Sequence, residues 1–189
     1  VKDALEELSV SFYENGGPQS GNFKGLNNSQ FKAPEDFKAV HDHYFPILEY
    51  YQKQYGYYDV FLLTAENGDA VFTIAKEADF GARHSDIPSS LRDVWQRAMT
   101  TGDVALSDTK RYEPSGGVPA QFVAAPVYRG DEIIGVVAMQ ISLEAINAIM
   151  QEREGMGATG ETYLVGEDKL MRSDSFLDPE GHSVLASFA

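Results

Sequence analysis

The stretch that decides the fold reads DVFLL at residues 59–63, ENGD at 66–69 and AVFTI at 70–74. Both outer runs are short and rich in β-branched and aromatic residues, which is typical of strands. Asn-Gly between two such runs is a strong signal for a tight hairpin. We therefore predict two antiparallel strands joined by a turn at 66–69.

Three further strand-like runs follow, at 104–107, 121–128 and 133–141, and the last two are joined by an Arg-Gly-Asp turn at 129–131. Strands that neighbour each other as hairpins, with helices inserted between them, favour an antiparallel sheet of α+β type. A doubly wound parallel sheet would need strict alternation of strands and helices, which this sequence lacks. The predicted fold class is thus a PAS-like α+β domain with a five-stranded antiparallel sheet.

Helical periodicity predicts a long N-terminal helix and flanking helices. The expected spans are 2–13, 34–55, 89–101 and 143–153. Pro46 lies inside the second span and should kink or interrupt it. Val40, Tyr44, Leu48 and Tyr51 approximate a heptad stripe there, which fits either a parallel homodimer or packing against the sheet.

Composition narrows the classes of function. The chain has 189 residues, no cysteine and a formal net charge of −14, so thiol chemistry is excluded and nucleic acid would be repelled. No apolar run is long enough to cross a bilayer. The start at Val1 leads us to expect a piece of a longer membrane-anchored protein.

The sequence contains no recognisable motif for catalysis, cofactor binding or metal binding. The chain is therefore expected not to be an enzyme. His41 and His43 flank Asp42 on a helix. Residues two apart on a helix point in different directions, so these histidines should not share an ion, and a solvated surface is expected for them.

Two loops carry the candidate binding residues. We call residues 76–88 the lid: this polar segment offers Arg83 and His84 to an anion, or it is simply a solvated connection. The second loop, 107–117, offers Asp108 and Tyr112 to a small ligand. Aromatic residues such as Phe61, Phe72, Trp95 and Phe122 fit a core role.

Six segments resemble the Cache superfamily of bacterial sensor domains in their order and spacing between residues 57 and 175. They are YYDVFL (57–62), KEADFG (76–81), YEPS (112–115), PAQFVAAPV (119–127), IGV (134–136) and GETYLVG (160–166). Together they are similar to the double-Cache sensory region of methyl-accepting chemotaxis proteins and of related histidine kinases and cyclases.

The resemblance implies a helical stalk at 1–56, a membrane-distal PAS-like module at 57–154, and the start of a truncated second module at 155–189. It also implies an extracytoplasmic, periplasmic ligand-sensing domain of an inner-membrane chemotaxis receptor, which signals through its terminal helices. The alternative is a periplasmic interaction or dimerisation module of a sensor kinase or cyclase with no small-molecule ligand.

In such families the ligand lies on the concave face of the sheet, beneath the lid. The resemblance therefore implies a site with contributions from the sheet, the lid, the following helix and the second loop. The residues are Phe61, Phe72, Phe122 and Ala124; Asp79, Arg83 and Trp95; and Asp108 and Tyr112. The arginine–tryptophan–tyrosine cluster of amino-acid-binding members is not matched, because Arg92 and Trp95 lack its spacing. A small carboxylate held by Arg83, Lys110 or Arg111 is the ligand class expected.

Overall fold

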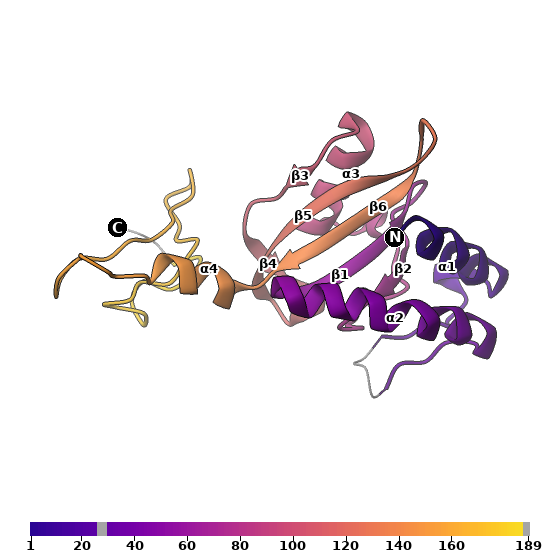
Figure 1. The fold of residues 1–189 in the computed structure, drawn as a ribbon, viewed down its shortest axis with the longest axis horizontal. Helices are drawn as coiled ribbons and strands as arrows, with labels where there is room; N and C mark the ends of the chain where they lie inside the picture. The colour runs from indigo at the N-terminus through magenta and orange to yellow at the C-terminus, as the bar shows by residue number, and fades with distance from the viewer. Residues whose placement is uncertain (26–29, 187–189) are drawn as a thin grey trace.

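The computed structural model of the chain describes residues 1–25 and 30–186, and its centre is an antiparallel sheet (Figure 1). Five strands lie in the order β2-β1-β6-β5-β3, and a sixth, β4, pairs with the other end of β5. The strands are β1 (Tyr57–Thr64), β2 (Ala70–Thr73), β3 (Ala105–Leu106), β4 (Lys110–Tyr112), β5 (Val118–Arg129) and β6 (Glu132–Ile141).

Helices cover both faces of the sheet, and a fourth helix leads away from it (Figure 1). α1 (Lys2–Glu14) and α2 (Glu35–Tyr55) pack on one face, and α3 (Ser90–Thr101) packs on the other. α4 (Leu143–Met150) follows β6 and carries the chain into the C-terminal segment.

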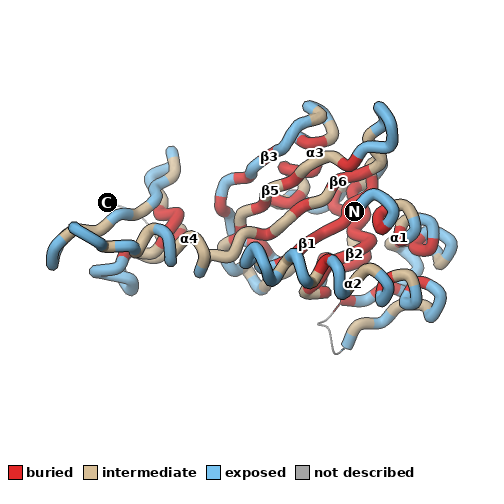
Figure 2. Tube along the Cα trace, viewed as in Figure 1, coloured by how far each residue is buried: buried red, intermediate tan, exposed pale blue. Residues whose placement is uncertain are grey.

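The two faces are separate cores because side chains alternate along each strand. On β1, Val60 and Leu62 point to α1 and α2, whereas Phe61 and Leu63 point to α3. All four are at most 4% exposed. Figure 2 shows β1 as largely buried and β5 and β6 as a mixture of buried and intermediate residues.

The α+β sheet and the hairpin at 66–69 are confirmed. Gly68 has the positive φ of +62° that such a turn requires. α3 begins after Ser89, whose hydroxyl accepts the Arg92 N–H at 3.1 Å, and ends before Gly102, which has the left-handed conformation. Local sequence signals were sufficient for these elements.

The loop predicted at 107–117 is wrong in part, since residues 110–112 form β4 and pair with residues 118–120 of β5. Lys-Arg-Tyr has no alternating apolar pattern, so only the partner strand reveals this element. The single-turn helix Glu113–Ser115 completes the segment.

The N-terminal segment 1–56 forms a layer of the fold as well as a long helix. Leu5, Leu8 and Phe12 of α1 and Phe37 of α2 are at most 1% exposed and belong to one core. α2 continues through Pro46 without interruption. Both α1 and α2 pack on the sheet, although they lie within the predicted stalk. How much of residues 1–56 acts as a stalk therefore stays a prediction.

The segment after α4 contains little regular structure. The strand-like runs of sequence at 161–165 and 169–172 predict a hairpin that opens a second module. Among the described residues they form only one antiparallel bridge, between Val165 and Met171, so that prediction is wrong. Met171 is fully buried, and much of the rest is exposed (Figure 2). The module boundary at 155 remains a prediction.

Within residues 1–25 and 30–186, no helix combines the length and the apolar character that a bilayer span needs.

The packing of α1 predicts a large effect of truncating its buried face. Leu8→Ala should lower the free energy of unfolding by about 2–5 kcal/mol, because a fully buried leucine leaves a cavity. Val10→Ala on the same helix is the control, since Val10 is 58% exposed and its loss should cost less than about 0.5 kcal/mol. Urea unfolding of both variants measures this, and equal small losses would show that α1 does not belong to the core.

Candidate functional site

Two buried carboxyl groups lie on the α3 face of the sheet, and the first belongs to Asp59 of β1. Asp59 is fully buried, and its Oδ1 accepts the backbone N–H groups of Val60, Ile74 and Ala75 at 2.7, 2.7 and 3.1 Å. These bonds join β1 to the point where β2 leads into the lid. Asp59 therefore anchors the lid to the centre of the sheet.

The second carboxyl group belongs to Asp79 of the lid, which is 1% exposed. The phenol of Tyr112, on β4, donates a hydrogen bond to its Oδ2 at 2.9 Å. We call Asp59 and Asp79 the acid pair. Strands β1 and β4 and the lid thus converge on one buried acidic position.

A second contact holds the lid closed beside the acid pair. Glu77 accepts hydrogen bonds from the Tyr58 phenol at 2.7 Å and from the Ser115 hydroxyl. Tyr58 belongs to β1 and Ser115 to the single turn after β4. Glu77 therefore bridges the two sides of the site.

Burial dominates the electrostatics of the acid pair. It raises the pKa of Asp59 to about 8, with a further rise from the Asp79 charge, while the three N–H donors oppose the rise. The pKa of Asp79 is raised to about 7, again mainly by burial; the Tyr112 hydrogen bond opposes this and the Glu77 charge adds to it. At neutral pH the pair therefore retains protons that exposed carboxyl groups would lose.

Three oxygen atoms of this region accept no hydrogen bond from the described residues: Oδ2 of Asp59, Oδ1 of Asp79 and Oε1 of Gln140. Gln140 on β6 is the register partner of Asp59 and is 4% exposed. It lines a cavity of about 110 Å³, which we call the inner cavity. The inner cavity is also lined by Tyr58, Ser115, Val118, Pro119, Ile141, Ser142, Leu143 and Glu144.

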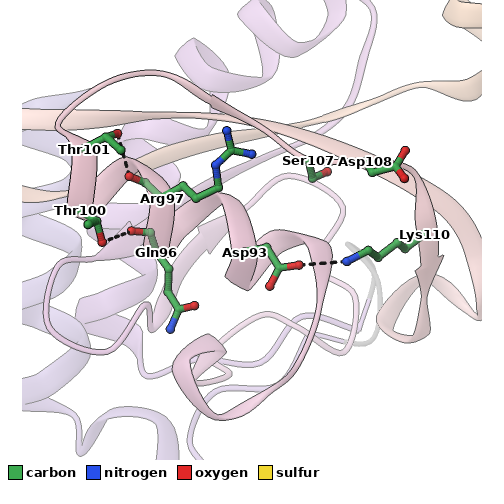
Figure 3. A pocket seen from close by; sticks show the side chains of 8 residues that line it. All are labelled: Asp93, Gln96, Arg97, Thr100, Thr101, Ser107, Asp108 and Lys110. Carbon is green, nitrogen blue, oxygen red and sulfur yellow. Dashed lines mark hydrogen bonds and ion pairs between the residues drawn. The ribbon is translucent and has the colours of Figure 1, made fainter. Parts of the chain in front are cut away.

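A larger, more open hollow of about 510 Å³ lies between α3 and the β3–β4 segment, and we call it the outer groove (Figure 3). Several of its charges are already engaged. Lys110 Nζ lies 3.1 Å from Asp93 Oδ2, and Arg97 donates to the Leu106 carbonyl at 2.9 Å. Asp108 also lines this groove.

Five of the residues predicted for the site lie together in the core beneath α3. They are Phe61, Trp95, Tyr112, Phe122 and Ala124. Ring centroids of Tyr112 and Phe122 are 4.9 Å apart, and Trp95 Nε1 donates to the Thr64 carbonyl at 3.0 Å. Together with Asp79, whose carboxyl group accepts the Tyr112 phenol, they form one well-packed buried cluster.

Phe72 lies on the opposite face of the sheet, so its prediction as a neighbour of Phe61 on the ligand face is wrong. In the β1–β2 register Phe72 pairs with Leu62, and both point to α2. Its ring lies 5.3 Å from that of His41. Side chains on directly paired residues share a face, and this decides the position of Phe72.

Arg83 and Asp108 are each held by a partner outside the acid pair. Arg83 Nε donates to Oδ1 of buried Asp69 at 3.0 Å, which fastens the lid to the β1–β2 turn. Asp108 receives a two-pronged contact from Arg172, with both distances 2.7 Å. That contact links the β3–β4 segment to the C-terminal segment.

The surface position expected for His41 is wrong, since it is only 3% exposed and is surrounded by aromatic rings of Phe31, Phe37, Phe45 and Phe72. Burial lowers the pKa of His41 to about 4 and that of His84 to about 4 as well. Both imidazoles are therefore neutral near pH 7. No group of three or more metal-ligating side chains occurs among residues 1–25 and 30–186.

Sequence reasoning missed Asp59 and Gln140. Asp59 lies two residues before Phe61, and Gln140 lies two residues after Ala138. Each therefore faces the core within an otherwise apolar strand. A polar residue on the buried face of a strand needs an explanation, so the alternation of the strand was a usable signal.

Comparison with known proteins identifies the family. The model of the methyl-accepting chemotaxis protein-like, first PDC sensor domain matches residues 37–148, more than half of the chain. The chain belongs to this family. The resemblance drawn from the sequence is thus confirmed, and this PDC sensor domain is the chain's core from α2 to α4.

Solved structures share the fold at low sequence identity. The sensor domain of the Vibrio cholerae histidine kinase DctB is 16% identical with a TM-score of 0.56, covering 96% of this chain and 68% of that one. The sensory domain of the Campylobacter jejuni chemoreceptor Tlp3 is 18% identical with a TM-score of 0.53, covering 95% and 74%.

A third structure is the ligand-binding domain of the Pseudomonas fluorescens chemoreceptor CtaA in complex with L-serine. It is 19% identical with a TM-score of 0.52, and the alignment covers 79% of this chain but only 58% of the CtaA chain. The chain therefore spans little more than half of that domain. A search of curated protein sequences found no match.

The raised pKa values of the acid pair predict a pH-dependent stability. A buried carboxyl whose pKa is raised in the folded state stabilises the fold below its unfolded pKa, near 4, and this contribution is lost as the pH rises through the folded value. The melting temperature should therefore fall between pH 6.5 and pH 8, above the range in which the buried histidines take up protons and below the range in which Lys76, whose pKa burial lowers to about 8, has lost its proton.

Asp59→Asn removes one of these charges and should flatten that slope. At pH 8 we expect a melting temperature at least about 3 °C above that of the unmodified chain, the shift that about 1 kcal/mol gives in a domain of this size. Asp93→Asn, at an exposed carboxylate, is the control and should keep the original slope. If the melting temperature of Asp59→Asn falls with pH as steeply as that of the unmodified chain, ionisation of Asp59 does not destabilise the fold.

Proposed function

We propose that this chain is the extracytoplasmic, periplasmic sensor region of a bacterial inner-membrane receptor, and that it binds a small molecule between the lid and the α3 face of the sheet. The observation that carries the proposal is the set of buried, unpartnered oxygens on the acid pair and on Gln140, the last of which lines the inner cavity. Binding rather than catalysis is the proposed activity, because the chain belongs to a family of sensor domains.

The proposed ligand-facing residues are Asp79 and Tyr112, with Phe61, Phe122 and Ala124 as the apolar floor and Trp95 as a wall. Asp59 and Gln140 are added to this set. Arg83 and Asp108 take the role of fastening the lid and the C-terminal segment. Supporting this division, the first group shares one core and the second makes ion pairs elsewhere.

Solved relatives support a small ligand. CtaA of Pseudomonas fluorescens has been solved in complex with L-serine and PctC of Pseudomonas aeruginosa in complex with GABA, and both share this fold. The cations proposed to bind a carboxylate ligand already have partners in this structure. Arg83 and Lys110 form ion pairs, and Arg111 donates to the Gly117 carbonyl. The place of such a ligand would be the outer groove.

The signal is proposed to leave through α4. Ser142, Leu143 and Glu144, the cap and first turn of α4, line the inner cavity together with Gln140. A ligand that binds one arrangement of the lid better than another shifts the population toward that arrangement, and the start of α4 is in direct reach of it. The Asp108–Arg172 ion pair supplies a second connection to the C-terminal segment.

A homodimer through α2 is also proposed. Val40, Tyr44 and Leu48 pack against the sheet, so the seam falls on the outward side of the helix. Four large side chains there are at least 51% exposed: Ile47, Tyr50, Tyr51 and Tyr55. Ile47, Tyr51 and Tyr55 follow one another at intervals of four and form one stripe.

The ligand site is tested by screening organic acids, amino acids and small amines with thermal shift, followed by calorimetric titration of the compounds that bind. Gln140→Leu should weaken binding at least about tenfold, because a buried hydrogen-bond partner of the ligand is lost. Gln96→Leu in the outer groove is the matched control and should bind normally. Loss of binding in the control alone would move the site to the outer groove.

A folded chain that binds nothing in this screen would favour the rival function, an interaction module without a small-molecule ligand.

The dimer is tested by sedimentation velocity. Ile47→Ser combined with Tyr51→Ser should shift the chain from dimer to monomer, because it removes apolar contact area from the centre of the seam. Val104→Ser, at an apolar residue that is 68% exposed away from α2, should leave the sedimentation unchanged. A dimer that persists in the double variant would place the interface elsewhere.

A further inference from the structure

We infer that a second ligand site lies on the opposite side of the sheet, in a cavity beside α2, and that it binds a neutral phenol. The cavity has a volume of about 480 Å³ and is lined mainly by residues of α2, together with Lys76, the first residue of the lid. We call it the α2 cavity. Because α2 covers the face of the sheet away from α3, this site is separate from the one proposed above (Figure 1).

Aromatic rings line part of the α2 cavity. They belong to Phe31, His41 and Phe45. The centroid of the His41 ring lies 4.8 Å from that of Phe31 and 5.3 Å from that of Phe45. Phe31 and Phe45 are half-buried, so part of each side chain stays accessible. A planar apolar ligand can therefore stack on these rings.

His41 contributes a buried hydrogen-bond acceptor. Its Nδ1 lies 2.9 Å from Oδ1 of Asp42, and Asp42 also forms an ion pair with Lys38. This carboxylate is therefore ionised and accepts the Nδ1–H. Burial lowers the pKa of His41 to about 4, so the imidazole is neutral near pH 7 and its Nε2 carries a lone pair.

The Nε2 atom of His41 has no donor among the described residues, although His41 is only 3% exposed. A buried acceptor without a partner costs free energy, and a ligand with an O–H group removes that cost. Nε2 is itself covered, so the ligand hydroxyl enters between the half-buried rings of Phe31 and Phe45.

The position of Lys76 also points to a ligand. Lys76 is 1% exposed, and its Nζ lies 4.0 Å from the centroid of the Phe45 ring and 5.1 Å from that of Phe31. Its φ of +54° is unfavourable for a residue with a Cβ, and strain of this kind is concentrated at binding sites. The positive charge beside the rings attracts the face of a further aromatic ring.

The charges around the cavity favour a neutral ligand. Lys38 and Lys76 are offset by Asp42 and Glu49 among the described residues that line it. Burial lowers the pKa of Lys76 to about 8, while the charges of Asp59, Asp42 and Glu49 oppose this fall. An anion would lie beside the carboxylates of Asp42 and Glu49, and a cation beside Lys38 and Lys76.

A phenol combines the required properties. Its hydroxyl group donates to Nε2 of His41, and its ring stacks on Phe31 and Phe45. A phenol is neutral at pH 7, because the pKa of a phenolic hydroxyl is about 10. A volume of about 480 Å³ admits a single substituted ring.

NMR titration of the whole chain at pH 7 with phenol, anisole, cyclohexanol and benzoate tests the inference. Phenol should cause saturable shifts of the amide signals of α2 and of the residues around Lys76. Anisole lacks the hydroxyl hydrogen, cyclohexanol lacks the aromatic ring, and benzoate carries a negative charge. Each of the three should bind at least about threefold more weakly than phenol.

His41→Phe keeps an aromatic ring in the same packing and removes the acceptor. It should weaken phenol binding at least about threefold. His43→Phe is the matched control, because His43 lies on the same helix but is exposed and does not line the cavity. It should bind phenol as the unmodified chain does.

The imidazole ¹⁵N signals of the unmodified chain give a readout that does not depend on the folding of a variant. The Nε2 signal of His41, assigned through contacts with the protons of Phe31 and Phe45, should have the position of an unprotonated nitrogen in the free chain. Phenol should move this signal toward the protonated position as it saturates, and anisole should leave it in place.

Several results would overturn the inference. They are the absence of phenol binding to the folded chain, binding of anisole, cyclohexanol or benzoate as tight as that of phenol, unchanged phenol binding in folded His41→Phe, and an Nε2 signal that stays in place at saturation. Loss of phenol binding in Gln140→Leu, with binding retained in His41→Phe, would place the phenol in the inner cavity and would also overturn it.

Discussion

The hydrogen bonds of Asp59 are the interaction on which the site depends. One carboxylate oxygen collects three N–H groups, from its own strand and from the corner where β2 becomes the lid. A carboxylate is the only short side chain that can accept several such bonds at one atom without a donor of its own. Burying a carboxylate costs free energy unless its remaining oxygen also has a hydrogen-bond partner. The anchoring of the lid and a buried oxygen without a partner among the described residues therefore belong to the same side chain.

The sheet lets two functions coexist because β1 and β6 are buried on both faces. One face holds α1 and α2 through a core of aliphatic and aromatic side chains that also encloses the neutral imidazole of His41. The other face mixes apolar floor residues with the acid pair and Gln140, and it ends at the first turn of α4. Stability is thus concentrated on the α1–α2 side, and the polar, less completely satisfied side is the one that faces the lid and the exit helix.

Much of the fold was predictable because its signals are local. The Asn67-Gly68 turn, the Ser89 and Ser142 caps and the alternation of the long strands each act within a few residues. The strand β4 was not predictable, since it depends on pairing with β5. For the candidate site the same limit holds: Asp79 and Tyr112, which hydrogen-bond across 33 positions, were both proposed from their loops, but nothing local joined them.

The sequence by itself determined the class of this domain: its strands, helices and turns, the family to which it belongs, and a lid rich in polar residues. Only the tertiary structure decided which face each of these residues occupies and with which partner. Phe72 faces α2 because of its register with Leu62, and Arg83 is engaged by Asp69. The physical reason is that burial and ion pairing are properties of neighbours in space, which the alternation along one strand leaves open.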